Sequence, residues 1–594
     1  MNKLLKVLLI MTIISSLVLC GLLYMLINRG KKKEATVSKL AQFQENYGKT
    51  DTDSKAISPT VYTDFSAEAG DRLYDPQRHD LVAERIEAMK ESGAYSEDDP
   101  LVIYNPYGIN AQSLYLYFTT EQRTKMSYRV NVQGGDTATF GAVPVGGSDY
   151  ANEHEVLLIG LATGENRVVL NLTDADGNTA VRSFYVKIDA LAGKEATKLA
   201  KAKGTSEKQQ ADGMYVTFGN AIDGKQLMLL YDNDGALRSE ILLENGAADR
   251  ILFVGDYMYF SFSDEGIAEA DRFGRVHRVF RTNGYRIGRD YCIDEAHNGI
   301  LILADKAGDG EAANGTGDRV LFADLEDGSV KELLNMGNYL AEYKEQCKKN
   351  EFGELNWLGL NAITILGDGE VLFGAGEASL VIKMEDIYGV PSLAYLLGDP
   401  ALFDDTGLEN DILVKNGKFA SFFGGNALTV ESVEKKASGI YILSMFDNRL
   451  GKSESRPDVD FSKLEKDLGS GMKKGTGSYY VRYLVNETAK TWELAEAMPV
   501  DYSGYEGCTQ VLPNDNLLVT CSGRFRFSEY DKERKAVCSF ETSGDSSLPR
   551  VFKYDFKGIF LEKEGEKASE DTKNSGGKKE TKTDENGRKT ESDT

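Results

Sequence analysis

The chain has 594 residues, several times the roughly 100–200 residues of a typical domain, and carries a formal net charge of -24 from 93 acidic and 69 basic side chains. This charge argues against nucleic acid as a partner, because phosphate binding requires a basic surface. An anionic small molecule would need a local basic pocket to offset the field of the whole chain. Glycine (60), tyrosine (30) and phenylalanine (26) are abundant, a composition typical of short strands joined by tight turns.

One long apolar run, residues 7–27, lies near the start of the chain. Its 21 residues can span a bilayer as a single helix. A cleaved signal peptide would have a shorter apolar region followed by a small-residue cleavage site, whereas residues 28–33 here read Asn-Arg-Gly-Lys-Lys-Lys. Cys20 follows Leu19 rather than a small residue, so it is interpreted as a helix residue. Residues 1–33 are therefore predicted to be an uncleaved signal anchor, a transmembrane helix that makes the membrane a partner.

Positive charges lie on both sides of this run: Lys3 and Lys6 before it, Arg29 and residues 31–33 after it. A strict positive-inside count would place the body of the protein in the cytoplasm, but large translocated domains often override that count. We expect a single-pass protein of the cell membrane with an extracytoplasmic body. Two features support this orientation: one cysteine pair and a family resemblance, both described below.

The cysteine pair is Cys508 and Cys521, which flank a candidate hairpin turn at Asn514-Asp515. If these are the two central residues of the turn, the cysteines face each other at a non-hydrogen-bonded pair, where side chains approach most closely. A disulfide and two buried free thiols are both compatible with this placement. The remaining cysteines of the body show no zinc-ligand spacing, so no metal site is expected; they are Cys292, Cys347 and Cys538.

Residues 34–98 are charged and predict a mostly helical stalk. Within them, apolar side chains recur at helical spacing and would lie on one face of a helix; they are Leu81, Val82, Ile86 and Met89.

Residues 99–190 change to an apolar and polar alternation with a period of two, which is typical of half-buried strands. Clear examples lie at residues 113–118, 127–132, 167–172 and 179–188. The stretch Asp174-Ala-Asp-Gly-Asn178 between the last two runs is a hairpin-turn signal. We predict a small β-sandwich over residues 99–190, followed by a linker rich in Lys and Ala at residues 191–212.

A unit of strands separated by tight turns recurs between residues 213 and 561. Six polar or glycine turns mark these units, at residues 231–235, 270–274, 323–328, 385–389, 485–488 and 530–533. Such a unit has a face that only its neighbours can bury, so the units must close into a ring. The predicted fold class is mainly β: an N-terminal β-sandwich followed by a six-bladed β-propeller, behind an N-terminal transmembrane helix. Residues 562–594 have almost no apolar side chain and predict a disordered charged tail.

Asn105-Pro-Tyr-Gly108 opens the predicted sandwich, and Gly160-Leu161 and Asn166-Arg-Val168 follow within it. With the propeller behind it, this arrangement resembles the bacterial arylsulfotransferase family over residues 99–561. The resemblance implies an extracytoplasmic enzyme that moves a sulfuryl group from a phenolic sulfate ester to another phenol. It also implies a histidine in the propeller channel that is transiently sulfated, with no nucleotide sulfate donor and no cofactor.

The family motifs that carry this chemistry are altered in this chain. Residues 290–292, Asp-Tyr-Cys, stand in place of a His-His-Asp motif and put Tyr291 at the catalytic position. Gly359 stands at the histidine of a Trp-x-His-x-Asn motif, and Gly376 at the arginine of another motif. Asn426 replaces the histidine that becomes sulfated. The retained motif residues are Trp357, Asn361, Ser379, Phe446, Asp447 and Asn448.

These replacements bear directly on sulfuryl transfer. A nucleophile must offer a lone pair on an atom that can carry the transferred group; an imidazole does so, whereas the carboxamide nitrogen of Asn426 does not at useful rates. Charge spreads over the equatorial oxygens during transfer and needs donors, which Gly359 and Gly376 cannot supply from a side chain. The histidines present elsewhere are interpreted as surface or packing residues: His79, His154, His277 and His297.

Three hypotheses about function remain open. The first is a catalytically degenerate member whose channel binds a ligand, with a phenolic or sulfated small molecule or an envelope protein as partner. The second is an active arylsulfotransferase with a different nucleophile, such as Tyr291 or an unplaced lysine. The third is a structural protein of the cell envelope. The sequence leaves open whether the chain is an enzyme and whether it forms a homodimer.

Overall fold

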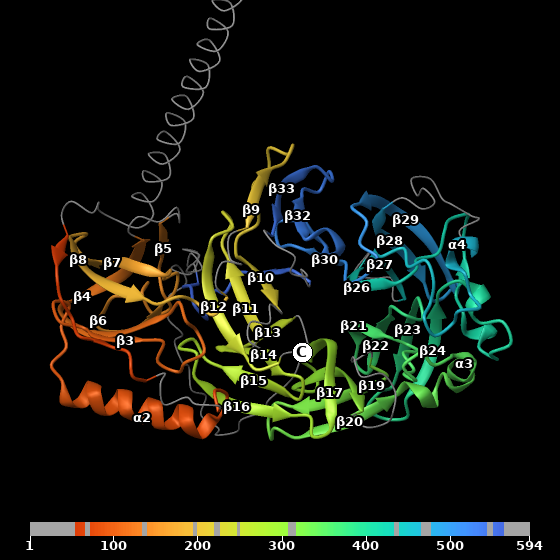
Figure 1. The fold of residues 1–594 in the computed structure, drawn as a ribbon, viewed down its shortest axis with the longest axis horizontal. Helices are drawn as coiled ribbons and strands as arrows, with labels where there is room; N and C mark the ends of the chain where they lie inside the picture. The colour runs from red at the N-terminus through yellow and green to blue at the C-terminus, as the bar shows by residue number, and fades with distance from the viewer. Residues whose placement is uncertain are drawn as a thin grey trace, which may run out of the picture. The chain divides into compact units, whose positions relative to one another are not determined.

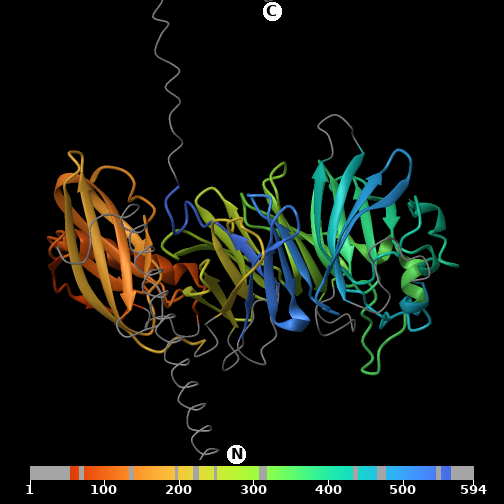
Figure 2. The same cartoon turned by 90° about the horizontal axis from the view of Figure 1, so that it is seen from above.

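The computed structural model of the protein describes residues 54–65, 72–132, 139–193, 199–218, 226–245, 250–306, 317–432, 439–464, 477–542 and 550–563. These residues form a mainly β structure, with an N-terminal sandwich in orange and a six-bladed propeller running from yellow to blue (Figures 1 and 2). The predicted fold class is confirmed for these two parts. No helix within these ranges is long and apolar enough to cross a membrane. The predicted span at residues 7–27 and the tail after residue 563 lie outside the described residues.

The sandwich is organised around one long strand, β4 (Leu114–Val132). The first half of β4 pairs with β3 and β6, and its second half pairs with β5 and β7, so this strand passes from one layer to the other. The other strands of this part are β1 (Lys55–Ala56), β2 (Val61–Tyr62), β3 (Leu101–Tyr104), β5 (Phe140–Ala142), β6 (Ala151–Leu158), β7 (Gly164–Asp174) and β8 (Thr179–Ile188).

The six blades are antiparallel sheets, apart from the short strand β25 (Val414–Lys415) of blade 5, which pairs parallel with β29 (Thr491–Val500). Blade 1 comprises β10 (Met214–Phe218), β11 (Gln226–Tyr231), β12 (Leu237–Leu243) and β34 (Phe552–Tyr554); blade 2 comprises β13 (Ile251–Val254), β14 (Tyr257–Ser263), β15 (Gly266–Ala270) and β16 (Val276–Arg281). Blade 3 comprises β17 (Tyr285–Asp294), β18 (Gly299–Lys306), β19 (Arg319–Asp324) and β20 (Val330–Asn335); blade 4 comprises β21 (Leu360–Gly367), β22 (Glu370–Ala375), β23 (Leu380–Glu385) and β24 (Ser392–Leu397).

Blades 5 and 6 each have a fifth strand. Blade 5 comprises β26 (Gly425–Ser432), β27 (Ile440–Asp447), β28 (Ser478–Asn486), β29 (Thr491–Val500) and β25 (Val414–Lys415); blade 6 comprises β30 (Cys508–Val511), β31 (Leu517–Cys521), β32 (Arg526–Tyr530), β33 (Ala536–Glu541) and β9 (Ala200–Lys203). The connections hold short helices: α3 (Ala341–Gln346), α4 (Phe461–Leu464), η3 (Met336–Asn338), η4 (Pro400–Leu402), η5 (Glu409–Asp411) and η6 (Ser522–Arg524). The first strands of neighbouring blades contact one another, as β17 does β21 and β21 does β26, so they form the inner wall of the ring.

Both ends of the propeller sequence close the ring. The C-terminal β34 pairs with β10 and supplies the inner strand of blade 1, with Phe552 opposite Val216. The N-terminal β9 pairs with β33 at the outer edge of blade 6, and Figure 1 shows these two strands side by side. The predicted linker at residues 191–212 was therefore wrong in part. Its Lys- and Ala-rich stretch Ala200–Lys203 is a strand, whose exposed side chains give no alternation to read from the sequence.

The predicted stalk is also corrected. β1 pairs with β8 and β2 pairs with β3, so residues before the helix extend the sandwich instead of standing free of it. The helical prediction is confirmed as α2 (Pro76–Ser92), which buries Val82 and Ile86. Leu81, however, is 65% exposed and does not share their face.

The sandwich also covers the outer edge of blade 1. The loop after β3 runs along β12, where the Ala111 N–H donates to the Glu240 carbonyl at 3.0 Å and the Leu242 N–H donates to the Ile109 carbonyl at 2.9 Å. An uncovered strand edge is a template for pairing with other chains, so this loop protects blade 1.

The predicted facing of Cys508 and Cys521 is wrong. Cys508 lies opposite Thr520, and no disulfide joins Cys508 to Cys521. The turn is longer than assumed, because the Leu512 N–H reaches the carbonyl of Asn516 across three intervening residues. This length shifts the register by one residue, and a one-residue shift turns a side chain to the opposite face of the sheet.

A buried ion pair lies where the two ends of the propeller meet. Lys553 Nζ lies 3.2 Å from Glu529 Oε2, and both side chains are nearly inaccessible to solvent. The Glu529 carboxylate also accepts hydrogen bonds from the Ala211 N–H at 2.6 Å and the Tyr215 hydroxyl at 2.7 Å. Blade 6 is thus joined to the first and last segments of the propeller through one carboxylate.

Replacing Lys553 by Met should lower the free energy of unfolding by about 3 kcal/mol, because the Glu529 charge loses its cation while it stays buried. The measurement is chemical denaturation followed by tyrosine fluorescence. Adding Glu529→Gln to this variant should recover part of the loss, since no charge is then left unpaired. The control Lys532→Met removes the 66% exposed lysine of an ion pair and should change stability little; an equal loss in both lysine variants would contradict this account.

His79 joins α2 to blade 2. The ring is fully buried, its Nδ1 accepts a hydrogen bond from the Val276 N–H at 2.8 Å, and its Nε2 lies 2.9 Å from the Leu73 carbonyl. Both contacts fit the neutral ring with the proton on Nε2. Burial lowers the pKa of His79 to about 4 despite the nearby Asp271 carboxylate, and the cations Arg78 and Arg275 act in the same direction as burial.

Because this pKa is depressed, the stability contributed by neutral His79 is complete above about pH 6.5 and is lost as the pH falls toward 4, by on the order of 3 kcal/mol. Denaturation midpoints measured at pH 7, 5.5 and 4.5 should therefore fall less in His79→Gln, which retains a donor and an acceptor, than in the wild type. His297→Gln is the control, because that side chain is 31% exposed. If the denaturation midpoint of the control also falls less with decreasing pH than that of the wild type, the assignment of the effect to His79 is refuted.

Candidate functional site

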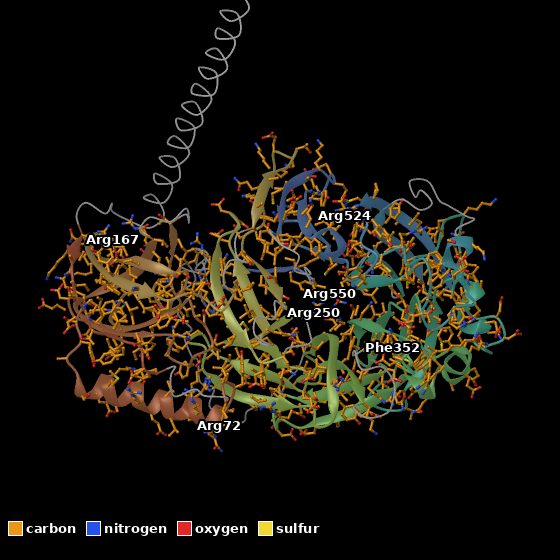
Figure 3. The ribbon with its side chains drawn as sticks, viewed as in Figure 1. Arg72, Arg167, Arg250, Phe352, Arg524 and Arg550 are labelled. Carbon is orange, nitrogen blue, oxygen red and sulfur yellow. The ribbon has the colours of Figure 1, made fainter. Side chains whose placement is uncertain are left out.

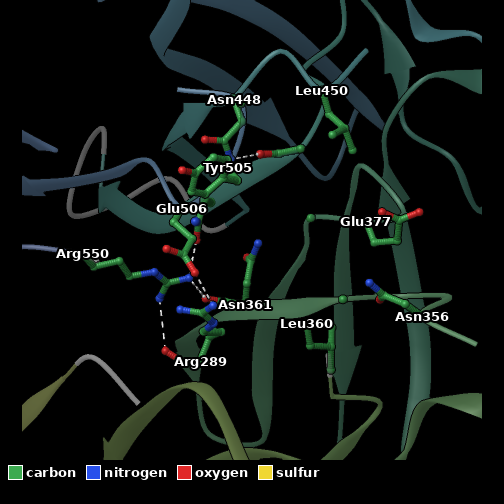
Figure 4. A pocket seen from close by; sticks show the side chains of 15 residues that line it. Arg289, Asn356, Leu360, Asn361, Glu377, Asn448, Leu450, Tyr505, Glu506 and Arg550 are labelled. Atoms are coloured by element: carbon green, nitrogen blue, oxygen red, sulfur yellow. Dashed lines mark hydrogen bonds and ion pairs between the residues drawn. The ribbon is translucent and has the colours of Figure 1, made fainter. Parts of the chain in front are cut away.

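A pocket of about 220 Å³ opens at one end of the ring, between blades 3 to 6 and the segment that leads into β34 (Figure 4). Four of the lining residues lie at or just before the start of a strand: Asn361 on β21, Asn426 on β26, Glu506 before β30 and Arg550 before β34. Arg289 lies in the middle of β17, where the pairing with β18 shifts register. Ring closure therefore assembles the pocket from segments far apart in the sequence.

Three of the four positions that the sequence analysis predicts to replace family motif residues line this pocket: Gly359, Gly376 and Asn426. The retained Asn361 and Asn448 line it as well. The sequence thus identified a real convergence of residues, drawn from blades 4 and 5.

The space beside the two glycines is occupied by neighbouring side chains. A Cβ atom added to Gly359 would come within 2.8 Å of the Glu377 Cβ atom, and Gly359 has a φ of +64°, which favours glycine. A Cβ atom on Gly376 would collide with the Asn361 side-chain nitrogen. Neither site can accept a larger residue unless Glu377 or Asn361 moves.

The structure does not bring Tyr291 into the pocket. Its side chain is buried in the apolar cluster between blades 2 and 3. The phenol donates a hydrogen bond to the Arg250 carbonyl and accepts one from the Ser261 N–H at 3.0 Å. Burial raises the pKa of Tyr291 well above its usual range, so its phenolate form is strongly disfavoured.

The other retained motif residues support the backbone beneath Asn426. The Ser379 hydroxyl accepts a hydrogen bond from the Gly424 N–H at 3.0 Å, and the Asn448 amide donates to the Gly424 carbonyl at 2.6 Å. Asp447 accepts from the Phe423 N–H at 3.0 Å, and burial raises its pKa to about 6 despite a neighbouring arginine. These groups position the start of β26.

The two remaining retained residues pack in the interior of the ring. Trp357 is buried and donates a hydrogen bond to an Asp318 carboxylate oxygen at 3.2 Å. Phe446 is buried in an apolar cluster with Tyr480 of blade 5 and with Leu517 and Val519 of blade 6.

Arg550 is the pocket residue that the sequence analysis missed. It is 2% exposed, and its guanidinium donates to the Asn426 side-chain oxygen, to the Asn361 carbonyl at 2.7 Å and to the Arg289 carbonyl at 3.1 Å. A cation thus contacts Asn426, the side chain that the sequence analysis predicts at the position of the sulfated histidine. No motif marks Arg550, because its place in the pocket depends on β34 pairing with β10.

Two carboxylates line the pocket, and each has protein partners. Glu506 forms an ion pair with Arg289. Glu377 accepts hydrogen bonds from the Ser453 hydroxyl at 2.6 Å and the Ser455 N–H at 2.9 Å. Burial raises the pKa of Glu377.

The pocket offers amide, guanidinium and carboxylate groups but no imidazole, since none of the four histidines of the chain lies among its lining residues. Across the described part of the chain, no group of three or more His, Cys, Asp or Glu side chains is arranged to hold a metal ion. The chemistry of this lining is suited to binding through hydrogen bonds and charge.

Comparisons with solved structures give only distant similarities. A nidogen/laminin complex is 11% identical with a TM-score of 0.33, over 57% of this chain and 97% of that chain. A putative 6-phosphogluconolactonase from Bacteroides uniformis is 11% identical with a TM-score of 0.32, over 73% and 99%. Virginiamycin B lyase from Staphylococcus aureus is 10% identical with a TM-score of 0.29, over 61% and 90%. Similarities this low say nothing about function, and no curated protein matches the sequence.

Family models match both parts of the chain. The model of the arylsulfotransferase Ig-like domain matches residues 101–190, which form the sandwich. The model of arylsulfotransferase (ASST) matches residues 199–570, which include all six blades and β9. The second match spans more than half of the sequence, and it begins one residue before β9 and so includes the strand that completes blade 6. By this match and by its fold, the chain belongs to the arylsulfotransferase family.

Proposed function

We propose that the protein is a catalytically degenerate arylsulfotransferase-like propeller that binds a ligand in its pocket without transferring a sulfuryl group. One observation carries the proposal: Gly359, Gly376 and Asn426 line a single formed pocket, and none of them offers a nucleophile or a cationic donor. A formed pocket with a buried arginine also favours a binding role over a purely structural one.

The protein's own contacts argue against covalent transfer. The Asn426 oxygen already accepts hydrogen bonds from Arg550 and from the Ala427 N–H, and its nitrogen lone pair is delocalised into the carbonyl. Such a group cannot accept a sulfuryl group at a useful rate. The alternative nucleophile Tyr291 lies outside the pocket with its hydroxyl already hydrogen-bonded.

We further propose that residues 1–33 anchor the protein in the membrane and that the sandwich and propeller lie outside the cell. The support is the length of the apolar run at residues 7–27, together with the extracytoplasmic location that the family resemblance implies. The ligand would then be a molecule of the cell envelope or the surrounding medium.

The purified protein should release no phenol from a chromogenic phenyl sulfate in the presence of an acceptor phenol, and no sulfated residue should be found by mass spectrometry. Losing one donor from a preorganised site lowers turnover about a hundredfold to a thousandfold, and losing the nucleophile removes the covalent route. Turnover of about 1 per second or faster would overturn the proposal.

Restoring the nucleophile alone should not restore turnover. In Asn426→His, the imidazole would face Arg550, while Glu377 and Asn361 still fill the space beside Gly359 and Gly376. The same assay measures this, with Asn448→His as a control that places an imidazole elsewhere in the pocket wall. Phenol release by Asn426→His but not by the control would show that the remaining pocket is still competent for transfer.

Protease added to intact cells should remove the propeller if the body lies outside. Immunoblotting of the propeller before and after treatment measures this, with a cytoplasmic protein of the same cells as the control for lysis. Survival of the propeller until the cells are broken would place the body in the cytoplasm, as the strict positive-inside count indicates.

A further inference from the structure

Arg550 is a buried cation for which the described part of the protein provides no carboxylate. Its hydrogen-bond acceptors are two backbone carbonyls and one amide oxygen, and its Nε–H has no acceptor. Burying a charge without an opposite charge is unfavourable. Since Arg550 lines the pocket, an anion bound there could supply the missing charge and accept from Nε.

The other charged groups of the pocket do not supply it. Glu506 is engaged by Arg289, and Glu377 is turned toward the serines of residues 453–455. Figure 4 shows Arg550 and Glu377 on opposite sides of the pocket, with Asn361 between them. Among the charged side chains that line the pocket, Arg550 is therefore the one whose charge is not balanced by an opposite charge.

Two asparagine side chains of the pocket lining have oxygen acceptors that lack donors. The side-chain oxygens of Asn356 and Asn361 are buried and have no hydrogen-bond partner among the residues that the structure describes. A buried acceptor left without a donor costs about 1–3 kcal/mol. A ligand that donates hydrogen bonds to these two oxygens must therefore carry hydroxyl or N–H groups.

We propose that the pocket binds a hydroxylated organic acid about the size of a single sugar ring, whose oxyanion pairs with Arg550 and whose hydroxyl groups donate to Asn356 and Asn361. The volume of about 220 Å³ is far larger than the roughly 10–15 Å³ that one water molecule needs, and it lies below the range of pockets that hold drug-sized ligands. Tyr505, 55% exposed in the lining, offers a ring face on which the ligand can pack. This inference rests on the proposed binding role and adds the class of ligand.

A simple phenyl sulfate could interact with Arg550 but not with the two asparagine oxygens. Its oxyanion can pair with Arg550, but it has no donor for the two asparagine oxygens. A neutral sugar has donors but leaves the guanidinium without an anion. The arrangement therefore favours a molecule that has both groups.

The test is isothermal titration of the purified full-length protein with glucuronate, phenyl sulfate and methyl glucoside at constant ionic strength. Glucuronate should bind at least tenfold more tightly than either of the other two. Arg550→Gln should weaken glucuronate and phenyl sulfate at least tenfold, because both lose the charged donor. Arg72→Gln is the matched control, since Arg72 is exposed and Figure 3 shows it well away from Arg550.

Asn356→Ala is a second variant for the case that Arg550→Gln does not fold, because the described residues form no hydrogen bond with the Asn356 side-chain oxygen that the change would remove. It should weaken glucuronate about 3- to 10-fold and leave phenyl sulfate unchanged. Phenyl sulfate binding as tightly as glucuronate, methyl glucoside binding as tightly as glucuronate, or no binding of any probe would each overturn the inference. Release of phenol from phenyl sulfate would instead overturn the proposed non-catalytic role, so the two failures are distinguishable.

Discussion

Closure of the ring is the constraint on which the rest of this protein depends. A four-stranded blade has two apolar faces that only its neighbours can bury, so the last blade must meet the first. Two strand pairings close the ring here: β34 pairs with β10 as the inner strand of blade 1, and β9 pairs with β33 at the outer edge of blade 6. The Glu529–Lys553 pair lies at this junction, and the strand that carries Lys553 also brings Arg550 to the pocket.

The pocket shows how replacements at several positions can support one another. Glu377 and Asn361 occupy the space beside Gly359 and Gly376, the two glycines predicted to replace a histidine and an arginine. Asn426 in turn is held by Arg550, a cation that comes from the segment that closes the ring. The pocket is therefore lined by several asparagine side chains around one buried positive charge. Such groups can form hydrogen bonds and an ion pair with a bound molecule.

The sequence predicted the parts of this structure that are encoded locally. Alternation and turn spacing repeat within each blade, so the number of blades and their antiparallel order could be inferred. The strand Ala200–Lys203 could not, because all four of its side chains are exposed and it forms only against a partner near the other end of the chain. The pairing of Cys508 was misplaced for a related reason: one additional turn residue reverses the face on which each side chain lies.

Of the residues of the candidate site, the sequence likewise predicted some and missed others. Motif comparison located Gly359, Gly376 and Asn426, which do line one pocket, and it misplaced Tyr291, which is an interior packing residue. Arg550 carries no local signal at all, because an isolated arginine in a polar segment is ordinary until the ring closes around it.

The double closure also has a consequence for biosynthesis. The inner strand of blade 1 and the outer strand of blade 6 each find their partner at the far end of the propeller sequence. A ribosome-bound chain can therefore build the middle blades early but cannot complete either terminal blade until nearly the whole sequence has emerged. Such long-range pairing slows folding, and it leaves strand edges unpaired for as long as synthesis lasts.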